Sequence, residues 1–143
     1  MSELLKLAER CEKATGPDRE LDGEIWSALS GDQVHRVTIG PDHRREDWVA
    51  QTIDPGCVVA TSRPVPRYTS SLDAAMTLVP EGYYWEVSLG VVQSGKGPYW
   101  AEVYRMDGSD YDYEPPIFGA PSPALALCAA SLRALAAKET ADA

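Results

Sequence analysis

The chain has 143 residues, of which 44% are hydrophobic and 24% charged, and we expect it to form one globular domain spanning 1–143. Lys and Arg number 13 against 22 Asp and Glu, which gives a formal net charge of -9 at pH 7. An acidic surface repels polyanions, so extended nucleic acid and anionic membranes are disfavoured as partners. The apolar runs are far shorter than the roughly 20 residues of a membrane helix, and the first residues do not form a signal peptide. We therefore expect a soluble, cytoplasmic protein.

Two amphipathic helices are predicted at the N-terminus. Within 2–14, apolar residues recur at the three-and-four spacing of a helix face, and Gly16 ends this helix. Pro17 suits the first turn of a second helix, which closes at 30–32. The apolar stripe of the second helix is predicted to consist of Leu21, Ile25 and Leu29.

Two short strands are predicted next, at 35–39 and 57–62, because both segments are rich in β-branched residues. The run between them, 40–56, is polar and contains Pro and Gly, so we expect an exposed loop there. The segment RPVPRYTSS at 63–71 then forms a proline-constrained crossing.

A third helix is predicted after this crossing. Ser70 and Asp73 form a capping-box-like pair at its start, and Pro80 ends it. The helix is expected to carry Leu72, Ala75, Met76 and Val79.

An antiparallel hairpin is predicted from 83–92 and 99–106, where apolar and polar residues alternate with period two. The residues expected on the buried face of its first strand are Trp85, Val87, Leu89 and Val91. The SGKG sequence at 94–97 contains a Gly-Lys pair but lacks the other residues of a phosphate loop. We therefore predict a simple hairpin turn.

An acidic loop and a long helix are predicted to complete the chain. The loop, 107–116, lacks the central Gly and the final Glu of a calcium-binding loop, so we expect it to be solvated. Ser122 and Pro123 fit the N-cap and first position of the helix, and the tail is expected to be disordered from about residue 139. The apolar stripe of this helix is predicted to contain Leu125, Cys128, Leu132 and Leu135.

The predicted order of elements is helix, helix, strand, strand, helix, strand, strand, helix. It lacks the regular strand-helix alternation that builds a parallel sheet. We therefore predict an α+β fold: an α-β-α layered sandwich with a mainly antiparallel sheet covered by helices on both faces.

Residues for metal binding or covalent catalysis form no recognisable pattern in the sequence. His35 and His43 stand apart from cysteines and paired acids, so we expect no metal and no cofactor. Cys11, Cys57 and Cys128 form no CxxC pair and are expected to be reduced and mostly buried. The sequence also lacks a GxSxG nucleophile elbow. We therefore expect no catalytic residues and no enzyme activity.

The segment 63–73 is the best candidate for binding a small anion, because it is stiffened by prolines and precedes a helix N-terminus. Its candidate ligand-binding residues are Arg63, Arg67, Tyr68, Thr69 and Ser70. Guanidinium, hydroxyl and helix-end N–H groups together suit a phosphate. In the structural alternative, Ser70 caps the helix, Tyr68 packs at its entry and the arginines pair with surface acids.

Three further residues could line the same pocket if the preceding loop folds over it. They are Arg44, Arg45 and Trp48, beside His43. The acidic residues concentrate near the termini and at 107–114, whereas the middle of the chain is basic. A small anion bound at one site is therefore compatible with the negative net charge.

Three blocks of the sequence resemble, in the same order, the phage ABA-sandwich domain family. They are LAERCEKATGPDRELDGEIWSAL, YTSSLDAAMTLVPEGYYWEV and PSPALALCAASLRALAA. The resemblance implies an α-β-α sandwich in a small protein encoded by bacteriophages or prophages and located in the host bacterial cytoplasm. It brings no assigned activity and no catalytic residues, and the stretch from His35 to Pro66 lies outside it.

We therefore expect a non-enzymatic phage accessory protein that binds a partner protein or a small ligand. A sharper hypothesis is an anti-defence protein that sequesters a nucleotide signal, with Arg63 and Arg67 on phosphate and an aromatic ring stacked on the base. One alternative is a structural or assembly protein of the phage, which forms homo-oligomers through tyrosine-rich faces. The other is a hydrolase that uses Asp42, Asp47 or Asp73.

Overall fold

The computed structural model describes residues 2–39, 41–42, 45–52, 61–94, 97–107, 110–113 and 117–142. Its helices are α1 (Glu3–Lys13), α2 (Arg19–Ser30), α3 (Leu72–Met76) and α4 (Pro123–Asp142). Its strands are β1 (Gln33–Ile39), β2 (Arg45–Thr52), β3 (Thr61–Pro64), β4 (Tyr84–Ser94), β5 (Gly97–Asp107), β6 (Asp110–Tyr113) and β7 (Ile117–Ala120). None of the helices in this described part of the chain combines the length and the hydropathy that crossing a bilayer demands.

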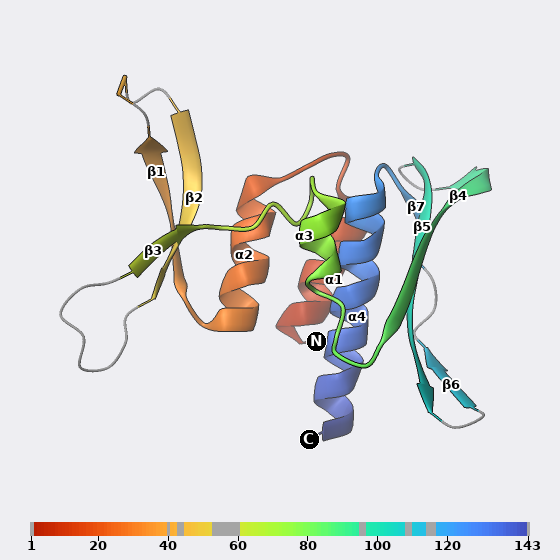
Figure 1. Ribbon diagram of the computed structural model, residues 1–143. Helices are drawn as coiled ribbons and strands as arrows, with labels where there is room; N and C mark the ends of the chain where they lie inside the picture. The colour runs from red at the N-terminus through yellow and green to blue at the C-terminus, as the bar shows by residue number, and fades with distance from the viewer. Residues whose placement is uncertain are drawn as a thin grey trace.

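The described strands form two antiparallel sheets. Sheet A has the order β1-β2-β3, and sheet B has the order β4-β5-β6 with β7 also paired to β5. Figure 1 shows the two sheets on opposite sides of the molecule with the helices between them. Helix α2 packs against β1 and β2, whereas α4 packs against β5 and β7.

Side-chain caps help to determine where three of the helices begin. Ser2, Asp18 and Ser122 each accept a hydrogen bond from the backbone N–H three residues later, at 3.3, 3.1 and 3.2 Å. Each cap satisfies a donor that the first turn of a helix leaves unpaired, and such a cap contributes about 1 kcal/mol. The predicted cap at Ser122 is confirmed.

The hydrophobic core lies between α1, α4 and the inner face of sheet B. Helix α4 is buried on most sides from Ala124 to Ala130, because alanine lets α1 approach one side of the helix and β5 another. Leu7 of α1, Leu125 of α4 and Val103 of β5 are almost completely buried. Burying a side chain of this kind contributes about 1.5–3 kcal/mol.

The predicted α+β class and the antiparallel pairing are confirmed. A single sheet with helices on both faces is not confirmed, because the described strands divide into two sheets. The crossing at 65–71 explains the difference, since it carries the chain from β3 to α3 beside the other helices. Strand β4 therefore starts on the far side of the helices and pairs with β5 instead of extending sheet A.

Strand β2 corrects the prediction of an exposed loop at 40–56. Residues Arg45–Thr52 pair with β1 on one side and with β3 on the other. The predicted strand at 57–62 is described only from Thr61, where β3 begins, and its earlier residues lie outside the described part of the chain.

The starts of α2 and α3 differ from the predictions by one or two residues. Asp18 is the N-cap of α2, so Pro17 precedes the helix instead of lying in its first turn. Helix α3 is capped by Ser71 and not by Ser70, and it ends at Met76, before the predicted end.

The C-terminal part of the chain is more regular than predicted. Helix α4 continues to Asp142, beyond residue 139, where the disordered tail is expected to begin. The acidic stretch at 107–116 was expected to be a loop, but Asp110–Tyr113 forms β6 and pairs with the end of β5. This pairing extends the β4–β5 hairpin by a further strand.

Two leucines that were predicted to lie in buried stripes are exposed. Leu29, in the last turn of α2, is 42% exposed, and Leu89 of β4 is 67% exposed. Trp85 and Val87, on the same face of β4 as Leu89, pack against the core as expected. The buried stripe of β4 therefore ends before Leu89.

Candidate functional site

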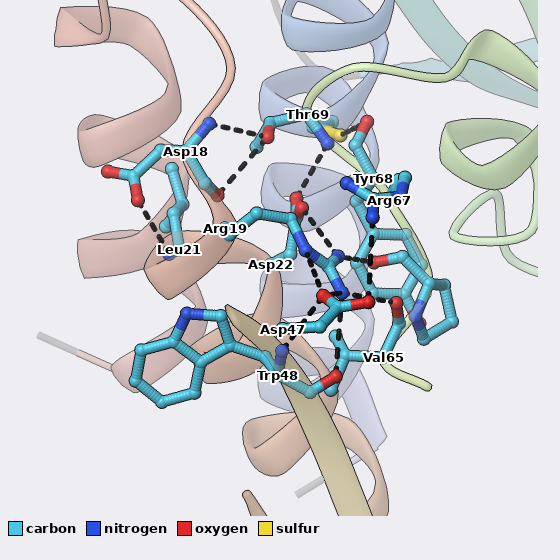
Figure 2. A network of polar contacts seen from close by, with 12 residues as sticks. Asp18, Arg19, Leu21, Asp22, Asp47, Trp48, Val65, Arg67, Tyr68 and Thr69 are labelled. Carbon is cyan, nitrogen blue, oxygen red and sulfur yellow. Dashed lines mark hydrogen bonds and ion pairs between the residues drawn. The ribbon is translucent and has the colours of Figure 1, made fainter. Parts of the chain in front are cut away.

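The predicted anion-binding segment lies beside the start of α2, where a network of polar contacts joins sheet A to the helices (Figure 2). Its centre is Arg19, the first residue of α2. The N-cap residue Asp18 fixes the backbone there, so the Arg19 side chain is directed from the helix start toward β2 and the segment 65–69.

Arg19 pairs with two carboxylates. Its Nη1 donates to Asp22 Oδ2 at 3.0 Å, and its Nε and Nη2 donate to Asp47 Oδ1 at 3.1 and 2.6 Å. Asp22 is completely buried, and buried carboxylates are stable in the charged form only when they are paired. Asp47 belongs to β2, so these ion pairs tie sheet A to α2.

Arg19 also donates to backbone carbonyls of the crossing. Its Nη2 lies 2.9 Å from the Val65 oxygen and its Nη1 lies 3.2 Å from the Pro66 oxygen. The Trp48 oxygen, 3.5 Å from Nη2, also accepts the Val65 N–H at 3.0 Å. One guanidinium thus satisfies acceptors on two chain segments, a role for which its planar fork of donors is suited.

Thr69 closes the other side of the network. Its N–H donates to Asp22 Oδ1 at 2.8 Å, and its Oγ1 accepts from the Asp18 N–H at 2.9 Å and donates to the Asp18 oxygen at 3.2 Å. Thr69 and Asp22 are both completely buried. The Thr69 hydroxyl, a predicted anion ligand, is therefore engaged inside the protein, as is the Thr69 N–H.

The environment of Asp47 favours its charged form. Burial alone would raise the pKa of this carboxyl, but hydrogen bonds from Arg19 and the Trp48 N–H, with the charges of Arg19 and Arg67, lower the pKa below its ordinary value of 3.8. Arg67 contributes from the surface, where its Nη2 lies 3.5 Å from Asp47 Oδ2.

The two arginines of the predicted segment remain on the surface with separate partners. The side chain of Arg63 is 57% exposed and that of Arg67 is 55% exposed. Arg63 lies 3.9 Å from Asp32 and places its guanidinium 4.9 Å from the centre of the Trp26 ring. As in the structural alternative, both arginines pair with acids, although the side chains of Asp32 and Asp47 are only 12% and 15% exposed.

Tyr68 points into the core instead of toward solvent. It is 3% exposed, and its backbone oxygen accepts from Cys128 Sγ at 3.1 Å. Burial, with smaller effects of Cys128 and Asp22, raises the pKa of Tyr68 to about 12. Ser70 is exposed, and its N–H donates to the Arg67 oxygen at 3.2 Å within a turn.

The predicted residues on the preceding loop are only partly described. Arg44 and His43 lie outside the described residues, and Arg45 is the first residue of β2, with its side chain outside the description. Trp48 is half-buried and packs on α2, since a Cβ added at Gly23 would lie 3.5 Å from Cε3 of its ring. Among the described residues, no ring contact or hydrogen bond joins the Trp48 side chain to Arg63 or Arg67.

Two groups that could serve chemistry, Asp47 and Cys128, have pKa values shifted away from neutrality. Cys11 and Cys128 are buried and free, as expected, while Cys57 lies outside the described residues. A hydrogen bond with Cys11, together with burial, raises the pKa of the Cys128 thiol, which disfavours the nucleophilic thiolate. Asp47, with its lowered pKa, is a poor general base.

A groove of about 520 Å³ lies between α1 and α2, and the segment 63–70 contributes none of its lining. Arg10 and Glu24 face each other across it as an ion pair. Among the described residues, no group of three or more His, Cys, Asp and Glu side chains is arranged to hold a metal ion.

A second candidate surface is the face of sheet B that points away from the helices, which we call the outer face. It is formed by Tyr84, Glu86 and Ser88 of β4 with Trp100, Glu102 and Tyr104 of β5, paired across the two strands. The rings of Tyr84 and Tyr104 stack with their centres 5.8 Å apart. The helices that contact sheet B, α1 and α4, lie on its other face in the described structure (Figure 1).

Period-two alternation in the sequence already separates the outer-face residues from Trp85, Val87, Ala101 and Val103. Only the structure shows that none of the described helices packs on the outer face. Arg19 and Asp22, which organise the polar network, carry no comparable local signal. Comparisons of the chain with protein-family models, with curated proteins and with solved structures found no match.

Proposed function

We propose that this protein acts by stoichiometric binding of a partner protein, and that the outer face of sheet B is the contact surface. The observation that carries the proposal is the pairing of Glu86 with Glu102 directly across β4 and β5, beside the stacked rings of Tyr84 and Tyr104. Tyr84 is 56% exposed and Tyr104 is half-buried, and aromatic residues are enriched at protein interfaces.

The opposed glutamates favour a cationic partner. Directly opposite residues of an antiparallel pair have Cβ atoms about 4.5–5.5 Å apart, and like charges there destabilise the sheet. Neither Glu86 nor Glu102 forms an ion pair within the described residues. An arginine or lysine from a partner would relieve this repulsion.

The tyrosine rings add a second contact for the same cation. A guanidinium over an exposed aromatic face gains about 0.5–1 kcal/mol, and its planar fork can also donate to a carboxylate. The net charge of -9 would increase the rate of encounter with a basic partner. The partner segment is therefore expected to present arginine.

The polar network supports binding over catalysis as the mode of action. Arg19, Asp22 and Thr69 are engaged with one another and with the backbone, which gives them a structural role. The hydrolase hypothesis depends on Asp42, Asp47 or Asp73, and Asp47 is engaged by Arg19. A binding protein needs no catalytic group.

The proposal is tested by titrating the protein with a tri-arginine peptide and measuring heat or tryptophan fluorescence. The double variant Glu86→Gln/Glu102→Gln should weaken binding about tenfold, because two exposed ion pairs are lost at about 0.2–1 kcal/mol each. The matched control, Glu20→Gln/Glu139→Gln, changes two exposed acids elsewhere by the same net charge. Equal weakening by both double variants would contradict the proposal.

The small-ligand hypothesis draws mainly on Arg63 and Arg67, because Tyr68 and Thr69 are buried. Thermal-shift measurements with cyclic and linear nucleotides test it, since a ligand that binds only the folded state raises the melting temperature. The resemblance to phage ABA-sandwich proteins, its α-β-α layering and the assembly role stay predictions.

A further inference from the structure

The outer edge of β4 is a second unused surface of sheet B, and its use does not depend on the proposed partner-binding function. Among the described strands, β4 hydrogen-bonds to β5 alone, so on one side of Tyr84–Ser94 the backbone N–H and C=O groups pair with no described strand. The pairing with β5 is regular from Tyr84 to Leu89 and shifts in register after that. The regular part of this edge is thus Tyr84–Leu89.

The regular part of this edge, which ends before the register shift that follows Leu89, carries few of the features that usually prevent strands from pairing. Natural edge strands are commonly protected by Pro, Lys or inward-pointing charge. The sequence YWEVSL at 84–89 contains no Pro, no Lys and no Arg, and Glu86 is its single charged residue. It combines high β-propensity with an open backbone, the combination that favours strand addition.

A strand added at the edge of β4 would bury the apolar side chain of Leu89. This residue is 67% exposed, and in the alternation of β4 it shares a face with Trp85 and Val87, which pack against the core. A neighbouring strand with an apolar residue opposite Leu89 would extend this face beyond the monomer.

We propose that two copies of this chain pair their β4 strands antiparallel, in a register centred on Val87. In an antiparallel pair related by a two-fold axis, the same strand edge supplies the N–H donors and the C=O acceptors on both sides. The β4 edge of a second copy can therefore pair with this one. In this register Val87 lies opposite Val87 of the second copy, and Leu89 lies opposite Trp85. Each exposed Leu89 is then covered by Trp85 of the other copy.

The charges on β4 select this register over its neighbour. Centring the pair on Glu86 would place two glutamates directly opposite each other, which is destabilising. Centring it on Val87 places Glu86 opposite Ser88 of the second copy and avoids that contact. Two chains of net charge -9 also repel at long range, so salt should strengthen the dimer by screening.

Sedimentation equilibrium of the full chain from about 1 µM to 1 mM should show a monomer–dimer equilibrium that shifts toward dimer as salt rises. Leu89→Lys should weaken association at least about tenfold, because it places a charge where an apolar contact forms. Leu29→Lys, at a leucine that is 42% exposed on α2, is the matched control and should leave association unchanged. Both substitutions make the net charge less negative by the same amount, so a selective loss cannot arise from added repulsion.

Oxidative cross-linking provides an independent measurement of the register. Val87→Cys places two thiols directly opposite each other, with Cβ atoms about 4.5–5.5 Å apart, close to the roughly 3.5–4.5 Å that a disulfide spans. This variant should form a covalent dimer faster than Ser88→Cys, whose thiol would face Glu86 of the second copy. A monomer at every concentration, equal effects of the two lysine variants, or cross-linking of Ser88→Cys at the same rate would each overturn the proposal.

Discussion

Replacing Arg19 by methionine is the most informative perturbation of the polar network. The methionine side chain would fill part of the same space but would remove every donor that joins α2, β2 and the crossing. Asp22, which is completely buried, would keep only the Thr69 N–H as a partner. An uncompensated buried charge is the main cost of this change.

The magnitude follows from the burial of these groups. Removing one partner of a fully buried ion pair costs about 3–5 kcal/mol, and the Arg19 side chain is 22% exposed, so water can reach part of the site. We expect Arg19→Met to lower the free energy of unfolding by about 3 kcal/mol. For a chain of this length, that corresponds to a decrease in melting temperature of about 10 °C.

Urea denaturation followed by circular dichroism measures this loss. Arg63→Met is the control, because its exposed guanidinium contacts Asp32 at 3.9 Å and should contribute about 0.5 kcal/mol. Arg19→Lys keeps the charge without the fork of donors and should fall between the two. If Arg19→Met lowers the free energy of unfolding no more than Arg63→Met does, the buried ion pairs of Arg19 do not stabilise the fold.

The same network predicts how stability depends on pH. Because the pKa of Asp47 is lowered in the folded state, the unfolded chain binds this proton more readily. The stabilisation is therefore present above the ordinary pKa of 3.8 and is lost as pH falls through the lower, folded-state pKa. In Asp47→Asn, this part of the acid sensitivity should disappear.

Three other measurements test separate parts of the structure. Gly97→Ala should destabilise the protein by about 2 kcal/mol or more, because its Cβ would lie 2.5 Å from the Ala120 oxygen, whereas Gly16→Ala has open space and should be close to neutral. Burial raises the pKa of Tyr68 to about 12, so the free energy of unfolding should fall as pH rises from 10 toward 12. Tyr68→Phe should remove this decrease, and a variant with an unchanged pH profile would contradict the assignment to Tyr68. Iodoacetamide should leave Cys11 and Cys128 unlabelled in the native protein and label both in urea, as peptide mapping can establish, and native labelling would contradict their burial.

Elements with a strong local signal could be predicted from the sequence. Helix α1 and the β4–β5 hairpin follow from periodicity over neighbouring residues, whereas α4 follows from its Ser122-Pro123 start and its apolar, alanine-rich composition. Burial within those elements was less predictable. Leu89 continues the apolar alternation of β4, yet the helices do not cover it, because burial depends on where the neighbouring layer ends.

Strand β2 and the Arg19 network could not be predicted from local patterns. The segment Arg45–Thr52 contains few β-branched residues and follows Pro and Gly, so its composition is typical of a loop. It forms a strand because β1 and β3 pair with it and because Asp47 reaches Arg19, 28 residues earlier in the chain. Contacts at such separations leave no periodic trace in a single sequence.

The candidate site shows the same limit. The sequence identified an unusual cluster of arginines and hydroxyl groups at 63–70. It could not show that the Thr69 N–H and hydroxyl form hydrogen bonds with Asp22 and Asp18. Alternation in the sequence separated the outer-face residues from the core. The structure added the register that places Glu86 opposite Glu102 and Tyr84 opposite Tyr104.

A chemical-shift titration of the isotope-labelled protein tests the central claim most directly. Tri-arginine and inorganic phosphate are added in parallel, and the backbone signals report which residues each probe contacts. We predict that tri-arginine shifts the signals of β4 and β5 around Glu86 and Glu102, and that phosphate produces no comparable shifts there. Shifts centred on 63–70 with phosphate, and none on β4 and β5 with tri-arginine, would contradict this prediction.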